Sequence, residues 1–146
     1  MFSGIVECMG KITTIDKTKD YYQIEVSYPS GFNEHLKKGA SIAVDGVCLT
    51  SKDNGHGQLK FDVIPETLRV TNIEFLSVDS KVNLERSLKF GDEVGGHILS
   101  GHISCRAPSK LISSDDEIEL RVQCPKEWIH YTVSYTHLTL PTNREV

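Results

Sequence analysis

The first two thirds of the chain contain several short stretches in which hydrophobic and polar residues alternate. Residues 22–28 place an aromatic or aliphatic side chain at every second position, and residues 59–63 and 82–85 repeat the alternation. Because successive side chains on a strand point to opposite faces, a period of two predicts strands with one buried face. We also expect strands over residues 40–51, on both sides of a turn, and over residues 2–15, which Gly10 interrupts.

Turn-forming residues separate these stretches. Residues 29–31 (Pro-Ser-Gly) end one predicted strand, whereas residues 45–46 (Asp-Gly) and 54–55 (Asn-Gly) predict tight turns between strands. A Pro near the first turn predicts a short helix over residues 65–71. Many short strands with close turns are typical of an antiparallel barrel or sandwich, and we favour a barrel because closure leaves no exposed strand edges.

Two parts of the sequence recur at a nearly constant offset. Residues 3–8 and 100–105 share the pattern Ser-Gly-x-apolar-x-Cys. Residues 23–29 and 119–125 share an alternating strand that ends in Pro. Agreement of this kind predicts that one structural module is duplicated along the chain.

The second copy is incomplete. Its counterpart of residues 40–50 should begin near residue 136, but residues 135–146 match nothing in the first copy. Fewer than about 40 residues seldom build a hydrophobic core alone. We therefore expect a complete module over residues 1–97, a partial module over residues 98–133 and a non-native tail over residues 134–146.

Composition and charge narrow the range of functions. The 146 residues carry a formal net charge of −4 without a basic stripe, which argues against a nucleic-acid partner. No apolar run is long enough to span a membrane and residues 1–10 lack a secretion signal, so we expect a cytoplasmic protein. The four cysteines form no C-x-x-C pair and lie at no zinc-finger distance from a His, so we expect free thiols and no metal site.

Residues 46–50 (Gly-Val-Cys-Leu-Thr) are the first of three segments that could carry chemistry. On a strand, Cys48 and Thr50 share a face while Leu49 points the other way. A thiol and a hydroxyl would then face one cavity, beside a Gly that lets a ligand approach the backbone. The alternative is that Cys48 is a buried, small hydrophobic residue.

The other two segments combine glycines, imidazoles and a strand-to-helix junction. Residues 95–102 place His97 and His102 among glycines, which suggests backbone bent around a ligand and side chains able to exchange protons. The alternative is two surface histidines on a linker between modules. Residues 62–67 offer backbone donors and acceptors, with Thr67 available to bond a polar ring, and the alternative there is a helix cap.

Taken together, these segments resemble the riboflavin synthases, enzymes built from two lumazine-binding modules. The resemblance runs from Met1 to about Val133 and rests on residues 1–7, 46–50, 65–69, 83–89 and 92–102. It implies an all-β fold, a six-stranded antiparallel Greek-key barrel with an incomplete second copy. It also implies a homotrimer whose active sites lie between modules of different subunits.

The resemblance further implies a reaction and the residues that serve it. Two molecules of 6,7-dimethyl-8-ribityllumazine dismutate, without cofactor or metal, to riboflavin and 5-amino-6-ribitylamino-pyrimidinedione. The residues expected to carry polar chemistry are Ser41, Cys48, His97 and His102. The residues expected around the ligand are Gly4, Ile5, Val6, Cys48, Leu49, Thr50, Asp62, Val63, Ile64, Pro65, Glu66, Thr67, Gly101, His102 and Ile103.

The chain departs from the resemblance near its C-terminus. Residues 133–146 resemble a tail found on unrelated conceptual translations, and the closing strands of the second module are missing, so we expect impaired activity. The main alternative is a non-catalytic lumazine- or flavin-binding protein. Cys48, His97 and His102 favour the enzyme, because a pure binder has no need of them. The flavin barrel of a reductase is disfavoured, because its Arg-x-Tyr-Ser motif and nicotinamide domain are absent.

Overall fold

The computed structural model of the chain describes residues 1–53, 57–113 and 118–132. These residues divide into two compact units, one over residues 1–104 and the other from Cys105 onward. Residues 98–104, which the sequence analysis assigns to the second module, pack with the first unit, and the division into modules stays a prediction. The predicted turn at residues 54–55 and the predicted tail at residues 134–146 lie outside the described residues.

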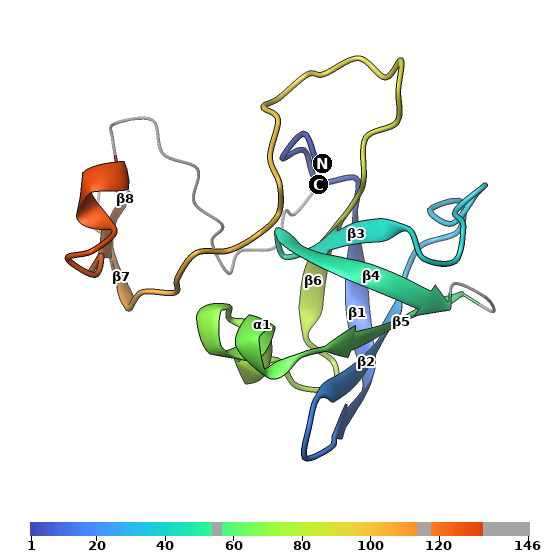
Figure 1. The fold of residues 1–146 in the computed structure, drawn as a ribbon, viewed down its shortest axis with the longest axis horizontal. Helices are drawn as coiled ribbons and strands as arrows, with labels where there is room; N and C mark the ends of the chain where they lie inside the picture. Colours follow the sequence, from blue (N-terminus) through green and yellow to red (C-terminus); the bar gives the residue numbers. More distant parts are fainter. Residues whose placement is uncertain (54–56, 114–117, 133–146) are drawn as a thin grey trace. The chain divides into compact units, whose positions relative to one another are not determined.

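Six antiparallel strands of the first unit close into a barrel (Figure 1). The strands are β1 (Cys8–Lys17), β2 (Tyr22–Ser27), β3 (Ser41–Val44), β4 (Val47–Asp53), β5 (Gln58–Val63) and β6 (Lys81–Arg86). Their order around the barrel is β1-β2-β5-β4-β3-β6. Strand β3 pairs with β4 and β4 pairs with β5, whereas β2 lies beside β5 and not beside β3. This arrangement is a Greek-key connection. The predicted six-stranded antiparallel Greek-key barrel is confirmed.

The barrel interior is filled by the apolar residues of the alternating stretches. Val26 on β2 and Phe61 on β5 are fully buried, and their polar neighbours point outward. Gly10 on β1 allows the strands to close, since a Cβ atom there would lie 2.7 Å from Leu84 Cδ1 and 2.8 Å from Val26 Cγ1. The predicted interruption at Gly10 is therefore absent, and β1 runs through this residue. The strand begins at Cys8, later than the predicted start at residue 2.

The Asp-Gly turn and the short helix lie where the sequence predicts them. Asp45 and Gly46 join β3 to β4 with φ angles of 48° and 79°, the left-handed conformation that tight hairpin turns use. Helix α1 (Pro65–Val70) has Pro in its first turn, and the 3₁₀ helix η1 (Ile73–Phe75) follows it. Across the part of the chain that the structure describes, no helix has the length and apolar character needed to cross a membrane.

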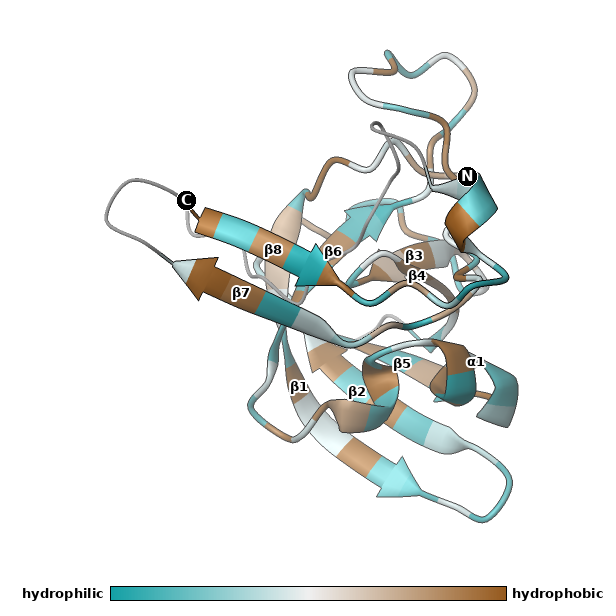
Figure 2. Cartoon of the chain, turned by 90° about the vertical axis from the view of Figure 1, so that its left-hand side faces the viewer, coloured by the Kyte–Doolittle hydropathy of each residue, from teal (hydrophilic) through white to brown (hydrophobic). Residues whose placement is uncertain are grey.

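The described residues of the second unit form a two-stranded antiparallel sheet. Strand β7 (Ser109–Ser113) pairs with β8 (Ile118–Val122), and the 3₁₀ helix η2 (Ile129–Tyr131) comes after them. Hydrophobic and polar residues alternate along β8 (Figure 2), yet none of its five residues is buried. A partial sheet agrees with the predicted incomplete second barrel, while its origin as a copy of the first stays a prediction.

Candidate functional site

The outward face of β3 and β4 carries polar side chains that the sequence analysis selects for chemistry. Ser41 lies opposite Thr50, and Ala43 lies opposite Cys48. Residues directly opposite in an antiparallel pair share a face of the sheet, with Cβ atoms about 4.5–5.5 Å apart. Leu49, between Cys48 and Thr50, is only 5% exposed and packs in the core. The alternation predicted over these three residues is therefore present.

A segment from further along the chain lies against Cys48. The Cys48 N–H donates to the carbonyl oxygen of Gly101 at 2.9 Å. Gly101 has φ +75°, and a Cβ atom there would lie 2.8 Å from Cys48 Cβ and 2.9 Å from Phe2 Cε2. Ile103 packs on the barrel core, whereas His102 is exposed. Cys48 is thus half-buried beneath this segment and on the opposite side of β4 from the core, which differs from the alternative of a core cysteine.

The N-terminal segment pairs with residues 96–99 of the same unit. Phe2 and Leu99 exchange two backbone hydrogen bonds of 2.8 and 2.9 Å, and the His97 N–H donates to the Ser3 carbonyl oxygen at 2.9 Å. A Cβ atom on Gly96 would collide with that same carbonyl oxygen. The glycines predicted to bend around a ligand therefore accommodate the chain's own N-terminal segment. His97 is exposed, but its backbone is fixed.

The junction between β5 and α1 presents a charged pair and an apolar side chain. The Asp62 carboxylate lies 2.7 Å from Lys52 Nζ and accepts a hydrogen bond from Gln23 Nε2 at 3.1 Å. The hydrogen bond from Lys52 is the largest of the effects that lower the pKa of Asp62. Ile64 follows at the start of α1 and is 57% exposed.

The remaining residues of this junction point in different directions. Val63 is fully buried in the core, so only its backbone is available to a ligand. Glu66 is exposed and pairs with Arg69 at 2.6 Å, while Thr67 is half-buried. Ile64 occupies the N-cap position of α1 and Pro65 follows it in the first turn, without a side-chain hydrogen bond to the helix end.

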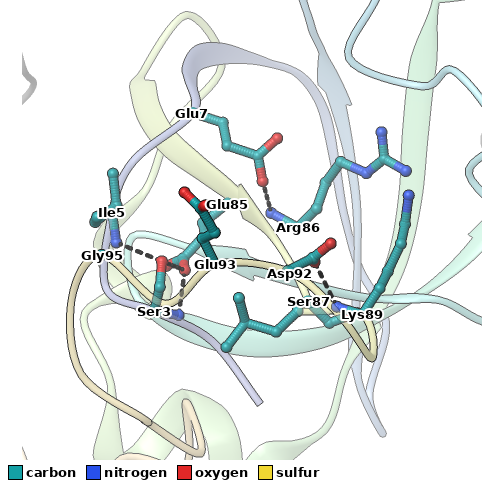
Figure 3. A pocket seen from close by; sticks show the side chains of 11 residues that line it. Ser3, Ile5, Glu7, Glu85, Arg86, Ser87, Lys89, Asp92, Glu93 and Gly95 are labelled. Carbon is teal, nitrogen blue, oxygen red and sulfur yellow. Dashed lines mark hydrogen bonds between the residues drawn. The ribbon is translucent and has the colours of Figure 1, made fainter.

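A cavity of about 330 Å³ opens between the N-terminal segment and the chain after β6 (Figure 3). Its lining residues are Ser3, Ile5, Glu7, Glu85, Arg86, Ser87, Leu88, Lys89, Asp92, Glu93 and Gly95. Of the residues predicted around the ligand, Ile5 alone lines this cavity. The cavity is therefore not the face that carries Cys48 and Thr50.

Two residues that hold the candidate site together were not selected from the sequence. Phe2 is 1% exposed and contacts the position that a Gly101 side chain would take. Glu85 is 7% exposed, although it is charged, and bonds to the N-terminal segment. Alternation with the core residues Val82 and Leu84 puts Glu85 on the outer face of β6, but it does not indicate that the carboxylate is buried.

The thiols differ in their surroundings. Burial, and then the nearby charge of Glu7, raise the pKa of the Cys8 thiol to about 11, so Cys8 stays protonated near neutral pH. Burial also raises the pKa of Cys105. Within residues 1–53, 57–113 and 118–132, no group of three or more His, Cys, Asp or Glu side chains is arranged to hold a metal ion.

A closed Greek-key barrel with a polar outer face, bordered at Cys48 by a glycine-bearing segment, is a small module suited to holding a ligand against its surface. The sequence profile described as the lumazine binding domain matches residues 3–87. The chain belongs to this lumazine-binding domain family.

Curated relatives carry the name riboflavin synthase. The chain is 39% identical over 121 residues to that of Escherichia coli (strain K12), covering 82% of this chain and 57% of the relative. It is 40% identical over 117 residues to that of Buchnera aphidicola subsp. Schizaphis graminum, covering 80% and 56%. The chain thus spans about half the length of the curated relatives it matches.

Solved structures of LumP share the fold. LumP complexed with riboflavin matches with a TM-score of 0.76 at 30% identity, covering 89% of this chain and 71% of LumP. LumP complexed with 6,7-dimethyl-8-(1'-D-ribityl) lumazine matches with a TM-score of 0.76 at 28% identity, covering 92% and 72%.

Proposed function

We propose that this chain supplies the lumazine-binding barrel of a riboflavin synthase, and that it binds 6,7-dimethyl-8-ribityllumazine and riboflavin. The observation that carries the proposal is the outward face where Ser41, Cys48 and Thr50 lie together beside Gly101. The riboflavin synthases among its relatives support the enzyme class, and the two LumP complexes support the ligands.

The proposed reaction is a dismutation of two lumazine molecules. One ring loses a proton from its C7 methyl group, and the resulting nucleophile adds at C7 of the other ring. Transfer of a four-carbon unit then gives riboflavin and the pyrimidinedione, without a cofactor. Holding two rings face to face converts an encounter in solution into a step within one complex, which is the main contribution we assign to the protein.

The residues of the face are proposed to act according to their chemistry. Cys48 is the candidate nucleophile or proton carrier, and the hydroxyls of Ser41 and Thr50 are candidate hydrogen-bond partners for the ring. His97 and His102 are the candidate acids and bases. Ile64, which is exposed, offers an apolar surface to an aromatic ring. The other residues proposed to border the ligand are Gly4, Ile5, Val6, Leu49, Asp62, Val63, Pro65, Glu66, Thr67, Gly101 and Ile103.

The whole enzyme is proposed to be a cytoplasmic homotrimer of two-module chains, with each site shared between modules of different subunits. Because this chain spans about half of its relatives, we expect it to bind ligand and to turn it over poorly. The second candidate function is binding without catalysis. It is favoured by the similarity to LumP, whose complexes hold a flavin and a lumazine.

Two measurements on the purified chain test these proposals. Fluorescence titration with 6,7-dimethyl-8-ribityllumazine and with riboflavin should show saturable binding. Riboflavin formation, followed by absorbance, should be slow for this chain and faster for a chain with a complete second module. Equal rates from the two chains would refute the need for a second module, and absence of binding would refute the proposed function itself.

A further inference from the structure

A buried carboxylate on β6 bonds to the turn of the N-terminal segment. Oε1 of Glu85 accepts hydrogen bonds from the Ser3 N–H at 2.6 Å and from the Ser3 hydroxyl at 2.9 Å (Figure 3). It also accepts one from the Gly4 N–H at 3.0 Å. Burial of a carboxylate is costly unless it is well hydrogen-bonded, and bonds to a charged acceptor are about twice as strong as neutral ones. Glu85 therefore fixes this turn more firmly than the backbone alone could.

The turn that Glu85 holds leads directly to predicted ligand residues. Gly4 has φ +80°, so the chain bends sharply after Ser3. The Ser3 hydroxyl, which donates to Glu85, also accepts from the Ile5 N–H at 3.2 Å. The direction of the backbone at Ile5 thus depends on Ser3, and the place of Ser3 depends on Glu85.

The same turn also fixes the segment that carries one of the histidines. The Ser3 carbonyl oxygen accepts from the His97 N–H at 2.9 Å. Glu85, Ser3 and His97 are therefore linked by successive hydrogen bonds. A shift of Ser3 away from β6 would move the backbone at His97 with it.

Strand register places Glu85 in the same row as Cys48. Glu85 on β6 lies opposite Ala43 on β3, and Ala43 lies opposite Cys48 on β4. These three side chains share the outward face of the barrel. Glu85 and Cys48 are separated by two strand spacings of about 4.8 Å each. The carboxylate thus anchors the N-terminal turn beside the candidate face.

We propose that Glu85 is a positioning residue, which holds the Ser3–Ile5 turn and, through Ser3, the backbone at His97 in the arrangement that ligand binding requires. It acts through these segments and is not a catalytic residue. The inference rests on the proposed function, since it assigns Glu85 a part in that same site.

Hydrogen exchange and ligand titration of the whole chain test this role. In Glu85→Ala, amides of residues 1–7 and 95–103 should exchange faster while those of β2 and β5 keep their protection. Affinity for 6,7-dimethyl-8-ribityllumazine and riboflavin should fall roughly tenfold or more, as expected for losing charge-assisted hydrogen bonds in the site. Glu93→Ala is the matched control, because Glu93 is an exposed acid that lines the same cavity and should leave both measurements unchanged.

Two conservative variants separate positioning from general stability. Glu85→Gln keeps an acceptor oxygen at the same reach and should retain part of the affinity. Glu85→Asp keeps the charge but withdraws it by about 1.5 Å, the length of one C–C bond, and should bind as weakly as Glu85→Ala. If Glu85→Ala does not fold, the comparison of the two conservative variants still tests the role. Glu85→Gln should then bind the ligand more tightly than Glu85→Asp.

Three results would overturn the inference. The first is unchanged ligand affinity in Glu85→Ala, and the second is tighter ligand binding by Glu85→Asp than by Glu85→Gln. Faster exchange of β2 and β5 equal to that of residues 1–7 would make Glu85 a residue of general stability. Absence of binding by the unchanged chain would instead refute the proposed function, and the exchange experiment, which needs no ligand, would still decide what Glu85 holds in place.

Discussion

Gly101 allows a direct test of the candidate site, because one added methyl group acts where the chain at Gly101 meets Cys48 of β4 and Phe2. In Gly101→Ala, the new Cβ atom would lie 2.8 Å from Cys48 Cβ and 2.9 Å from Phe2 Cε2, both too close for carbon atoms. Phe2 is fully buried and Cys48 belongs to the barrel, so the segment at Gly101 has to move outward. That movement lengthens the 2.9 Å hydrogen bond from the Cys48 N–H to the Gly101 carbonyl oxygen.

The expected magnitude follows from two separate costs. The left-handed conformation at φ +75° costs an L-residue about 1–2 kcal/mol. Displacing the segment adds the cost of overpacking, typically about 1–3 kcal/mol. Only the second cost displaces the candidate face, and we expect ligand affinity to fall roughly tenfold, which is about 1.4 kcal/mol of binding free energy.

A matched control separates these two costs. Gly39 has φ +84°, and a Cβ atom there would meet nothing within 4 Å among the described residues, so Gly39→Ala carries the conformational cost alone. Denaturant unfolding should show both variants destabilised, with Gly101→Ala the more affected. Fluorescence titration with riboflavin and 6,7-dimethyl-8-ribityllumazine should show weaker binding for Gly101→Ala only. Unchanged affinity in Gly101→Ala, or an equal loss in both variants, would refute the proposed place of the ligand.

Three further substitutions test other parts of the structure. Cys48→Ala, in a protein with a complete second module, should lower riboflavin formation by about 10²–10⁴-fold while unfolding is unchanged, and full activity would exclude a chemical role for the thiol. Gly10→Ala should destabilise the barrel by about 1–3 kcal/mol in denaturant unfolding, because its Cβ atom would meet Leu84 Cδ1 at 2.7 Å. Burial raises the pKa of Asp45 above its ordinary value, so its contribution to stability is largest in acid, below its unfolded pKa, and is lost as pH rises through the folded value. Asp45→Asn keeps an acceptor for the Asn83 N–H and should therefore gain stability relative to the unchanged chain as pH rises from acid to neutral, as thermal unfolding would show.

The barrel could be predicted because its information is local. The alternation over residues 22–28 and 59–63 specifies which side of each strand is buried, and the Asp45-Gly46 turn pairs two neighbouring strands. The same alternation placed Cys48 and Thr50 on one face with Leu49 in the core. The number of strands and the Greek-key connection came from the family resemblance, because alternation does not say which strands become neighbours.

The contacts that assemble the candidate site could not be predicted, because they join residues far apart in the chain. Nothing in the sequence near Glu85 indicates that its carboxylate bonds to Ser3, 82 positions away. The glycines of residues 95–102 were predicted to bend around a ligand, and that role stays a prediction. What approaches them is the N-terminal segment and Cys48, which only the closed barrel brings to that place.

Binding and turnover make different demands on this chain. The face formed by Ser41, Cys48 and Thr50, with the segment at Gly101, lies entirely within residues 1–104, so one unit contains every residue proposed to hold one ring. The proposed dismutation needs a second ring, which in our proposal a second module holds against the first. Among the described residues after Cys105, the strands are β7 and β8 alone, and none of their residues is buried. Saturable binding with little riboflavin formation is therefore the behaviour that the proposed function predicts for this chain, and it would arise even if every residue of the first site were placed for catalysis.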